Sequence, residues 1–229
     1  MYRLLPFLFL AYLFNEYKNS SSVKYLALGD SLAVGVGAFW GCGYTRLYYN
    51  WLISSANYRH LCYCNLGVIG CTSKDLLNSI TFNSNYRNAI ISSSIITVDI
   101  GGNDILQHKY CPDKLYEALG CFRYNLFTML KEIYCLNNNN AQIYIMDIYN
   151  PYPVGHEMHE IAETWVTEFN TVIWSTIRCH EFKVSVIAKV YAAYKGNECR
   201  YTLINYNNVH PNTLGYKIIN DCYNSITII

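Results

Sequence analysis

The chain has 229 residues, of which 52% are hydrophobic and 14% are charged, and its formal net charge is +1. This length and apolar share predict one compact domain with a full buried core. The 17 Lys and Arg residues are scattered along the chain and form no basic stripe. The composition therefore argues against a nucleic acid as the partner.

The first 22 residues differ in character from the rest. The apolar run Leu4–Phe14 follows a single basic residue, Arg3, and is too short to span a bilayer comfortably. It has the length of a signal-peptide core, but the basic region is weak and no small-x-small cleavage site follows. Two interpretations stay open. In one, the segment is an export signal or membrane anchor of a secreted or membrane-associated protein; in the other, it is a surface-packed extension of an intracellular protein. We divide the chain into this extension, 1–22, and a domain, 23–229.

The ten cysteines have irregular spacing. Cys62 and Cys64 flank one residue of a predicted strand and so share a face, and no C-x-x-C pair has metal-ligand spacing. We therefore expect buried free thiols and no metal site.

In chain order, apolar β-type runs alternate with helical patterns. The predicted strands are Val23–Leu28, Leu61–Leu66, Ile95–Ile100, Ile143–Ile148 and Val184–Val190. The predicted helices are Tyr44–Ser54, an amphipathic stripe from Pro112 to Leu136, a second stripe from Met158 to Thr176, and Leu214–Tyr223. Near-continuous apolar strands suit a sheet that is buried on both faces. The pattern predicts a three-layer α/β/α sandwich around a mostly parallel five-stranded sheet.

Polar motifs follow these predicted strands, where parallel sheets bind ligands. Ser31, in Gly-Asp-Ser-Leu, follows the first strand, and Gly70 follows the second. Asn103, in Gly-Gly-Asn-Asp, follows the third strand, and His210 lies in the last loop, directly before Pro211. We therefore expect these four positions to converge at one edge of the sheet.

The residue types suit acyl transfer. A serine hydroxyl becomes a nucleophile when a base takes its proton, and histidine, with a pKa near neutrality, can do this. The negative oxygen of a tetrahedral intermediate needs fixed donors. The backbone N–H groups of Ser31 and Gly70 and the side-chain amide of Asn103 could supply three of them, forming an oxyanion hole.

Together, these motifs resemble the GDSL or SGNH hydrolase family in order and spacing, from Val23 to about Tyr223. The later stretches Ile148–Pro153 and Ala192–Gly196, with Val209-His210-Pro211, look most like the bacterial spore-germination lipase branch. The resemblance implies an esterase or lipase that needs no cofactor or metal and acts on a small-molecule or lipid ester. We also expect it to act as a monomer.

The family resemblance further implies that Ser31 is the nucleophile, that His210 is its base, and that Gly70 and Asn103 complete the oxyanion hole with the Ser31 N–H. The family's last motif reads Asp-x-x-His-Pro, but this chain has Asn207 at the aspartate position. We assign Asn207 the role of orienting His210. Because an aspartate-to-asparagine change in chymotrypsin lowers turnover about ten-thousand-fold, a catalytically impaired relative that binds lipid or acyl ligands stays an alternative.

Two further groups of residues have predicted roles near these motifs. Asp30 and Asp104 are expected to accept N–H bonds where helices begin. Three aromatic residues are expected to line an acyl pocket: Tyr149, Tyr152 and Trp40.

Overall fold

A computed structural model describes residues 23–55, 58, 60–179 and 185–227 of the chain. The predictions made for the first 22 residues lie outside this part. Five parallel strands form the central sheet in the order β2-β1-β3-β4-β5. They are β1 (Lys24–Gly29), β2 (Cys62–Asn65), β3 (Ile95–Asp99), β4 (Gln142–Met146) and β5 (Ser185–Ala188). The expected parallel sheet is confirmed, and each strand agrees with its predicted range to within two residues at either end.

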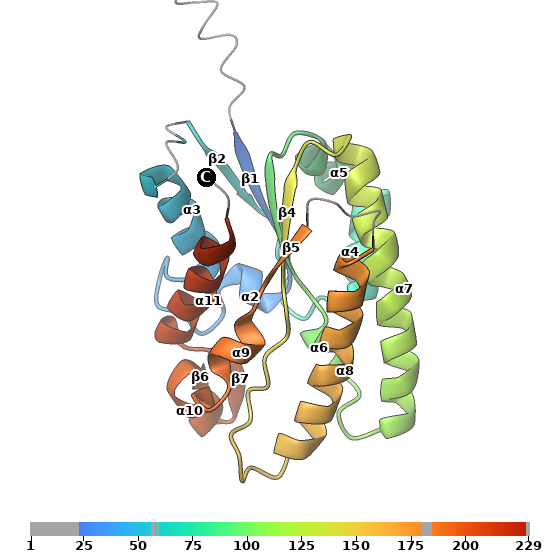
Figure 1. Ribbon diagram of the computed structural model, residues 1–229, viewed down its shortest axis with the longest axis vertical. Helices are drawn as coiled ribbons and strands as arrows, with labels where there is room; N and C mark the ends of the chain where they lie inside the picture. Colours follow the sequence, from blue (N-terminus) through green and yellow to red (C-terminus); the bar gives the residue numbers. More distant parts are fainter. Residues whose placement is uncertain (1–22, 56–57, 59, 180–184, 228–229) are drawn as a thin grey trace, which may run out of the picture.

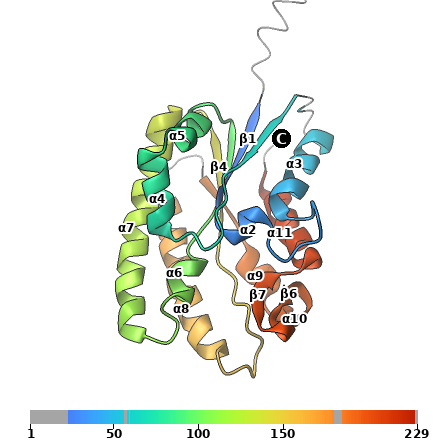
Figure 2. The same ribbon diagram turned by 180° about the vertical axis from the view of Figure 1, so that it is seen from behind.

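Helices cover both faces of the sheet, as Figure 1 shows and Figure 2 shows from behind. One layer contains α3 (Tyr44–Ser55), α9 (Val190–Tyr194) and α11 (Thr213–Ile226). The other contains α4 (Ser73–Phe82), α5 (Ser84–Ile91), α7 (Pro112–Asn137) and α8 (His159–Ile177). The three-layer sandwich is therefore confirmed. α4 and α5, which the apolar pattern did not predict, fill the connection between β2 and β3.

Alternate residues of β1 point into two separate cores, because successive side chains of a strand face opposite sides of the sheet. Leu26 and Leu28 join the aliphatic core beneath α4, α7 and α8. Tyr25 and Ala27 join a tyrosine-rich core beneath α3 and α11. The chain has 23 tyrosines, and most of those in the two cores lie on this second face of the sheet.

The cysteines are not arranged as expected. All ten are free, in agreement with the sequence, but only Cys71 is buried and seven are exposed. The prediction of buried thiols is wrong for those seven. Cys62 and Cys64 are exposed because β2 is an edge strand.

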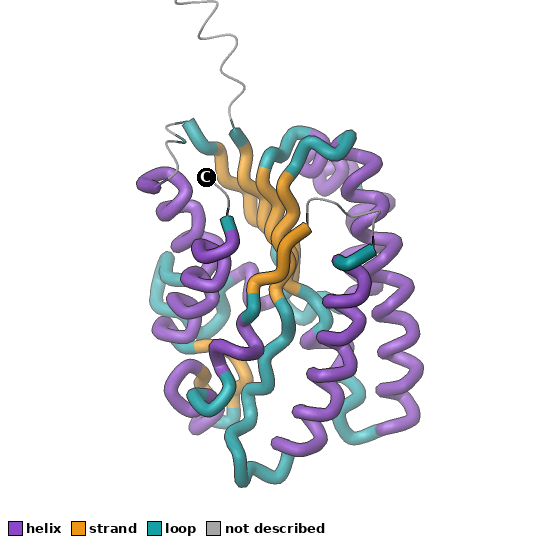
Figure 3. The backbone as a smooth tube through the Cα atoms, viewed as in Figure 1, coloured by secondary structure: helices purple, strands orange, loops and turns teal. Residues whose placement is uncertain are grey.

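The loops that follow the strands lie together at one edge of the sheet, as the backbone trace in Figure 3 shows. Short elements are added at this edge: α2 (Ser31–Val34), α6 (Gly102–Leu106), α10 (Glu198–Tyr201), η1 (Ile204–Tyr206), and the hairpin of β6 (Thr202–Leu203) and β7 (Asn208–Pro211). Among the described helices, none is both long and apolar enough to cross a membrane.

Candidate active site

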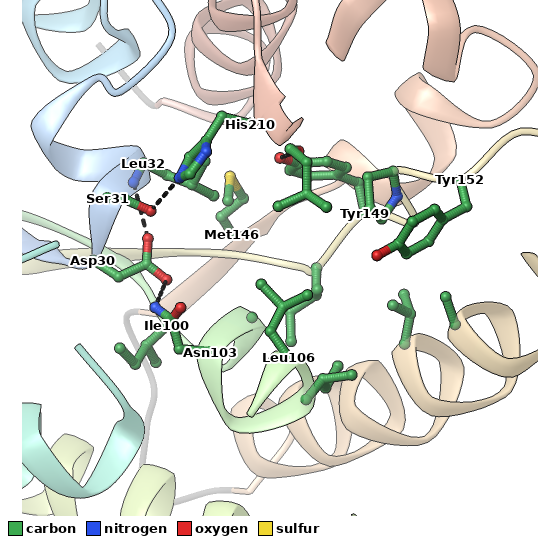
Figure 4. Close-up of a pocket in the computed structure, with 17 residues that line it drawn as sticks. Asp30, Ser31, Leu32, Ile100, Asn103, Leu106, Met146, Tyr149, Tyr152 and His210 are labelled. Carbon is green, nitrogen blue, oxygen red and sulfur yellow. Dashed lines mark hydrogen bonds between the residues drawn. The ribbon is translucent and has the colours of Figure 1, made fainter. Parts of the chain in front are cut away.

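Ser31 and His210 come from opposite ends of the chain and meet at this edge. Ser31 is the first residue of α2, directly after β1, and His210 lies in β7. The Nε2 atom of His210 is 2.9 Å from the Oγ atom of Ser31 (Figure 4). Ser31 is buried and His210 is half-buried, so the serine is shielded while the imidazole stays partly open to solvent.

Asn208 fixes which ring nitrogen of His210 carries the proton. The Asn208 Oδ1 atom lies 3.0 Å from the backbone N of His210 and 2.7 Å from its Nδ1. A backbone N–H can only donate, so the Asn208 atom that faces it is the carbonyl oxygen. That oxygen can only accept, and Nδ1 must therefore carry the ring proton when the imidazole is neutral. Nε2 then presents its lone pair to Ser31, which is the tautomer that a general base needs.

The structure places Asn208, and not Asn207, against the histidine. Asn207 ends η1 in the left-handed region, with φ of 56°, and its side chain is exposed. Asn208 and His210 are two residues apart in β7, and residues with that spacing lie on the same face of a strand. Asn208, rather than Asn207, therefore reaches the imidazole, and the prediction for Asn207 does not match this geometry.

Burial changes the ionisation of the histidine. The partly desolvated imidazole has a pKa lowered from its usual value, because burial disfavours the charged form. At neutral pH His210 is therefore mostly neutral and able to accept a proton. The neutral Asn208 amide supplies no negative charge that would raise this pKa again.

A buried carboxylate, Asp99, holds the turn that presents the serine. Its Oδ2 atom accepts hydrogen bonds from the backbone N–H groups of Asp30, at 3.3 Å, and Ala33, at 3.1 Å. The hydroxyl of Tyr44 donates to the other oxygen of the same carboxylate. Burial, with the nearby Asp30 carboxyl second, raises the pKa of Asp99 well above its usual range. Through these hydrogen bonds, Asp99 connects β3 to the backbone on both sides of Ser31.

The Asp30 carboxyl caps α2, as expected, by accepting from the Leu32 N–H at 2.9 Å. Burial raises the pKa of Asp30 to about 6. Its Oδ2 atom also accepts from the side-chain amide of Asn103 at 3.2 Å. The same Asn103 nitrogen donates to the Cys71 carbonyl at 2.9 Å. The amide is therefore held beside the serine by groups from two neighbouring loops.

Asp99→Ala is expected to lower the free energy of unfolding by about 3 kcal/mol, since it leaves two backbone N–H groups and one hydroxyl without their acceptor. The matched variant Asp99→Asn keeps an acceptor oxygen and is expected to cost less than half as much. Urea denaturation of the two variants measures the difference. Equal losses would mean that the hydrogen bonds to Asp99 do not hold the turn.

Two more residues of the predicted site follow β3 and β2: Asp104 and Gly70. Asp104 accepts from the backbone N–H of Ser73 at 2.9 Å and from its hydroxyl at 2.6 Å, so it tethers the start of α4 to α6. This agrees with its predicted capping role.

Gly70 is exposed and has a φ of 78°, and a Cβ atom built on it would meet no atom within 4 Å. Its backbone conformation, and not a lack of space, is what favours glycine there.

An apolar chamber extends from Ser31 toward α8 (Figure 4). Its volume is about 120 Å³. Four polar residues line the end of the chamber near Ser31: Asp30, Ser31, Asn103 and His210. The rest of the lining is mainly apolar: Leu32, Ile100, Gly102, Ile105, Leu106, Met146, Ile148, Tyr149, Pro151, Tyr152, Ala162, Val166 and Val209. Gly70 is not part of this lining.

Two of the three aromatic residues expected around an acyl pocket do line the chamber. Tyr149 and Tyr152 are buried in its wall, and the Tyr149 hydroxyl is occupied by donating to the Val209 carbonyl at 2.8 Å. The prediction is wrong for Trp40, which is 94% exposed in the loop between α2 and α3. The sequence also gave no sign that Ala162, on α8, would face the chamber.

The comparisons with known proteins agree with this architecture. The model of the GDSL-like lipase/acylhydrolase family matches residues 27–218. The chain is 26% identical over 210 residues to the spore germination lipase LipC of Bacillus licheniformis, covering 87% of this chain and 94% of that protein. The predicted resemblance to the spore-germination lipases is thereby confirmed.

Solved structures show the same fold. A lipase from a goat rumen metagenome superposes with a TM-score of 0.77 at 24% identity, covering 89% of this chain and 96% of that one. The phospholipase A1 of Streptomyces albidoflavus has a TM-score of 0.65 at 17% identity, covering 90% of this chain and 100% of that one. With the family match spanning most of the described domain, the chain belongs to the GDSL-like lipase/acylhydrolase family.

Proposed function

We propose that this protein, an ester hydrolase by its family, cleaves carboxylic esters through an acyl-serine intermediate on Ser31. The observation that carries the proposal is the 2.9 Å contact between Ser31 Oγ and His210 Nε2 at the mouth of an apolar chamber. The lipase names of the relatives support the same class of substrate, a carboxylic ester with an apolar part.

In the first half of the reaction, Ser31 Oγ attacks the ester carbonyl carbon while its proton passes to His210 Nε2. The C–O bond to the alcohol then breaks, and Nε2 returns the proton to the leaving oxygen. In the second half, Nε2 takes a proton from water as the water oxygen attacks the acyl carbon. The acid leaves and Ser31 regains its proton. In every step the Asn208 side-chain oxygen accepts a hydrogen bond from Nδ1–H and keeps the imidazole ring in the same orientation.

The oxyanion formed at each attack needs donors, and we assign this role to the backbone N–H groups of Ser31 and Gly70 and to the Asn103 amide. Both neighbours of the Asn103 nitrogen are acceptors, the Cys71 carbonyl and the Asp30 carboxyl. The contact to Asp30 is the longer of the two, so we propose that this N–H turns to the oxyanion when substrate binds.

The test is hydrolysis of nitrophenyl butyrate across pH, combined with labelling by a fluorophosphonate. We expect one covalent label on Ser31 and a value of kcat/KM that rises with pH to a plateau. The inflection should lie below the usual histidine value of about 6.5, because only the neutral imidazole acts as a base and burial lowers its pKa.

Asp30→Asn serves as the control, because the Asp30 carboxyl, with a pKa of about 6, titrates in the same pH range. Asparagine also caps helices, so α2 keeps its first turn. The inflection should persist in this variant if it belongs to His210. Folded protein that neither hydrolyses esters nor reacts with the fluorophosphonate would contradict the proposal. It would favour the alternative, a catalytically impaired protein that binds lipid or acyl ligands.

A further inference from the structure

We infer that the chamber between α2 and α8 holds the acyl chain of the ester, and that Ala162 on α8 limits the length of that chain. This inference rests on the proposed function, since it assumes that Ser31 carries the acyl group. It adds a class of substrate, esters of medium-chain fatty acids, and a residue that sets the specificity.

The lining of the chamber changes from polar to apolar with distance from the serine. In Figure 4, Ser31, Asp30, Asn103 and His210 lie together at one end, while Tyr152 lies at the other, close to α8. No lysine, arginine or glutamate is among the lining residues. A long apolar chain would gain free energy there by leaving water, whereas a sugar would lose its hydrogen bonds.

The chamber is larger than an acetyl group requires. Its volume is about 120 Å³. A dry apolar cavity of roughly 150 Å³ accommodates benzene, which has six carbons. By that comparison, an acyl chain of roughly five or six carbons would fill the space that the structure provides.

The position of His210 favours the acyl chain over the alcohol as the occupant. His210 gives its proton to the departing alcohol and then activates water, so water must reach its side of Ser31. His210 is half-buried and therefore still partly open to solvent, while the chamber offers water almost no partners beyond its catalytic end. An acyl chain placed in the chamber leaves the solvent side free for both steps.

Ala162 is suited to control the depth of the chamber. It lies on α8, is 8% exposed, and packs in a small cluster with Tyr152, Met158 and Ile204. Val166 follows one turn later and lines the same chamber. A phenylalanine at position 162 would place a ring where the end of the chain would lie, whereas Val166→Ala would add space.

The experiment compares kcat/KM for nitrophenyl acetate, butyrate, hexanoate and octanoate. The wild-type protein should prefer hexanoate to acetate. Ala162→Phe should lower kcat/KM for hexanoate at least about tenfold and leave acetate nearly unchanged, since a single methylene of pocket space is worth about tenfold or more. Val166→Ala should shift the preference toward octanoate, and it adds no bulk that could prevent folding.

Ile161→Phe is the matched control, because Ile161 is 44% exposed on the same helix and does not line the chamber. It should leave the chain-length profile unchanged. The inference would be overturned if Ala162→Phe and Val166→Ala both showed the same dependence of kcat/KM on acyl chain length as the wild-type protein. So would an effect of these variants that depends on the length of the alcohol in a series of acetate esters.

A binding measurement separates this inference from the proposed function. Calorimetry on Ser31→Ala should detect hexanoate, and the Ala162→Phe change should weaken its binding in that background about tenfold. Failure of Ser31-dependent hydrolysis with hexanoate binding intact would contradict the acyl-serine mechanism alone. Hexanoate binding that is unaffected by Ala162→Phe would contradict the role of Ala162 alone.

Discussion

Replacing Ser31 with alanine is expected to lower kcat for ester hydrolysis about a million-fold, the size of the loss when a serine hydrolase loses its nucleophile. The change removes one hydroxyl, whose hydrogen bond goes to His210 Nε2. The fold should therefore be retained, and the melting temperature should change by no more than a few degrees. Single-turnover and steady-state rates with a nitrophenyl ester measure the loss.

His210→Ala should cause a loss of similar size, because the serine and its base act as one unit. The double variant with both changes should then be less than about threefold slower than Ser31→Ala alone. The residual rate of either variant comes only from substrate binding and the oxyanion donors. Multiplication of the two losses in the double variant would mean that Ser31 and His210 act independently. That result would contradict the shared proton transfer.

Much of this arrangement could be predicted because it depends on local patterns. Buried strands need apolar runs, and β1, β3 and β4 were found where those runs occur. The amphipathic stripe that begins at Pro112 also predicts α7 correctly, because the apolar spacing of a helix recurs many times over 26 residues. The polar motifs then fell at the ends of these strands, so the meeting of Ser31 and His210 followed from topology.

The parts that could not be predicted depend on contacts between distant segments. Asp99 lies within an apolar strand, and its role is visible only once α2 and Tyr44 are packed against it. The wall of the chamber is another such case, since nothing in the helical pattern from Met158 to Thr176 indicates that Ala162 faces a chamber. Trp40 was misplaced because an aromatic residue in a loop gives no indication of the direction it faces.

Asn207 does not contact the imidazole in this structure, for a local reason that does have a sequence signal. A motif counted by spacing places the orienting residue three positions before the histidine, but β7 is extended at this point and brings the second position before it into contact. The left-handed backbone of Asn207, a conformation that asparagine tolerates, is the signal of a turn. With two consecutive asparagines before the histidine, the position of this turn decides which of them reaches the imidazole.

Among positions outside the Ser31–His210 pair, Asn208 is the one whose substitution we expect to change turnover most. Asn208→Ala removes the only acceptor that the described structure gives to Nδ1 of His210, and it frees the ring to rotate and change tautomer. We expect kcat to fall roughly a hundredfold. This is less than the roughly 3 × 10⁴-fold loss seen when a charged aspartate is removed in subtilisin, because no charge is lost here. Asn207→Gly keeps the left-handed backbone and should leave kcat within about twofold.

Asn208→Asp tests the same contact in the opposite direction. A carboxylate at 2.7 Å from Nδ1 would stabilise the imidazolium, so kcat should rise by up to about tenfold and the inflection of the pH profile should move to higher pH. The sign follows from charge, since a nearby anion raises the pKa of histidine. If Asn207→Asp raised the rate instead, and Asn208→Asp did not, the imidazole would be oriented by Asn207 during catalysis and the contact in this structure would not be the functional one.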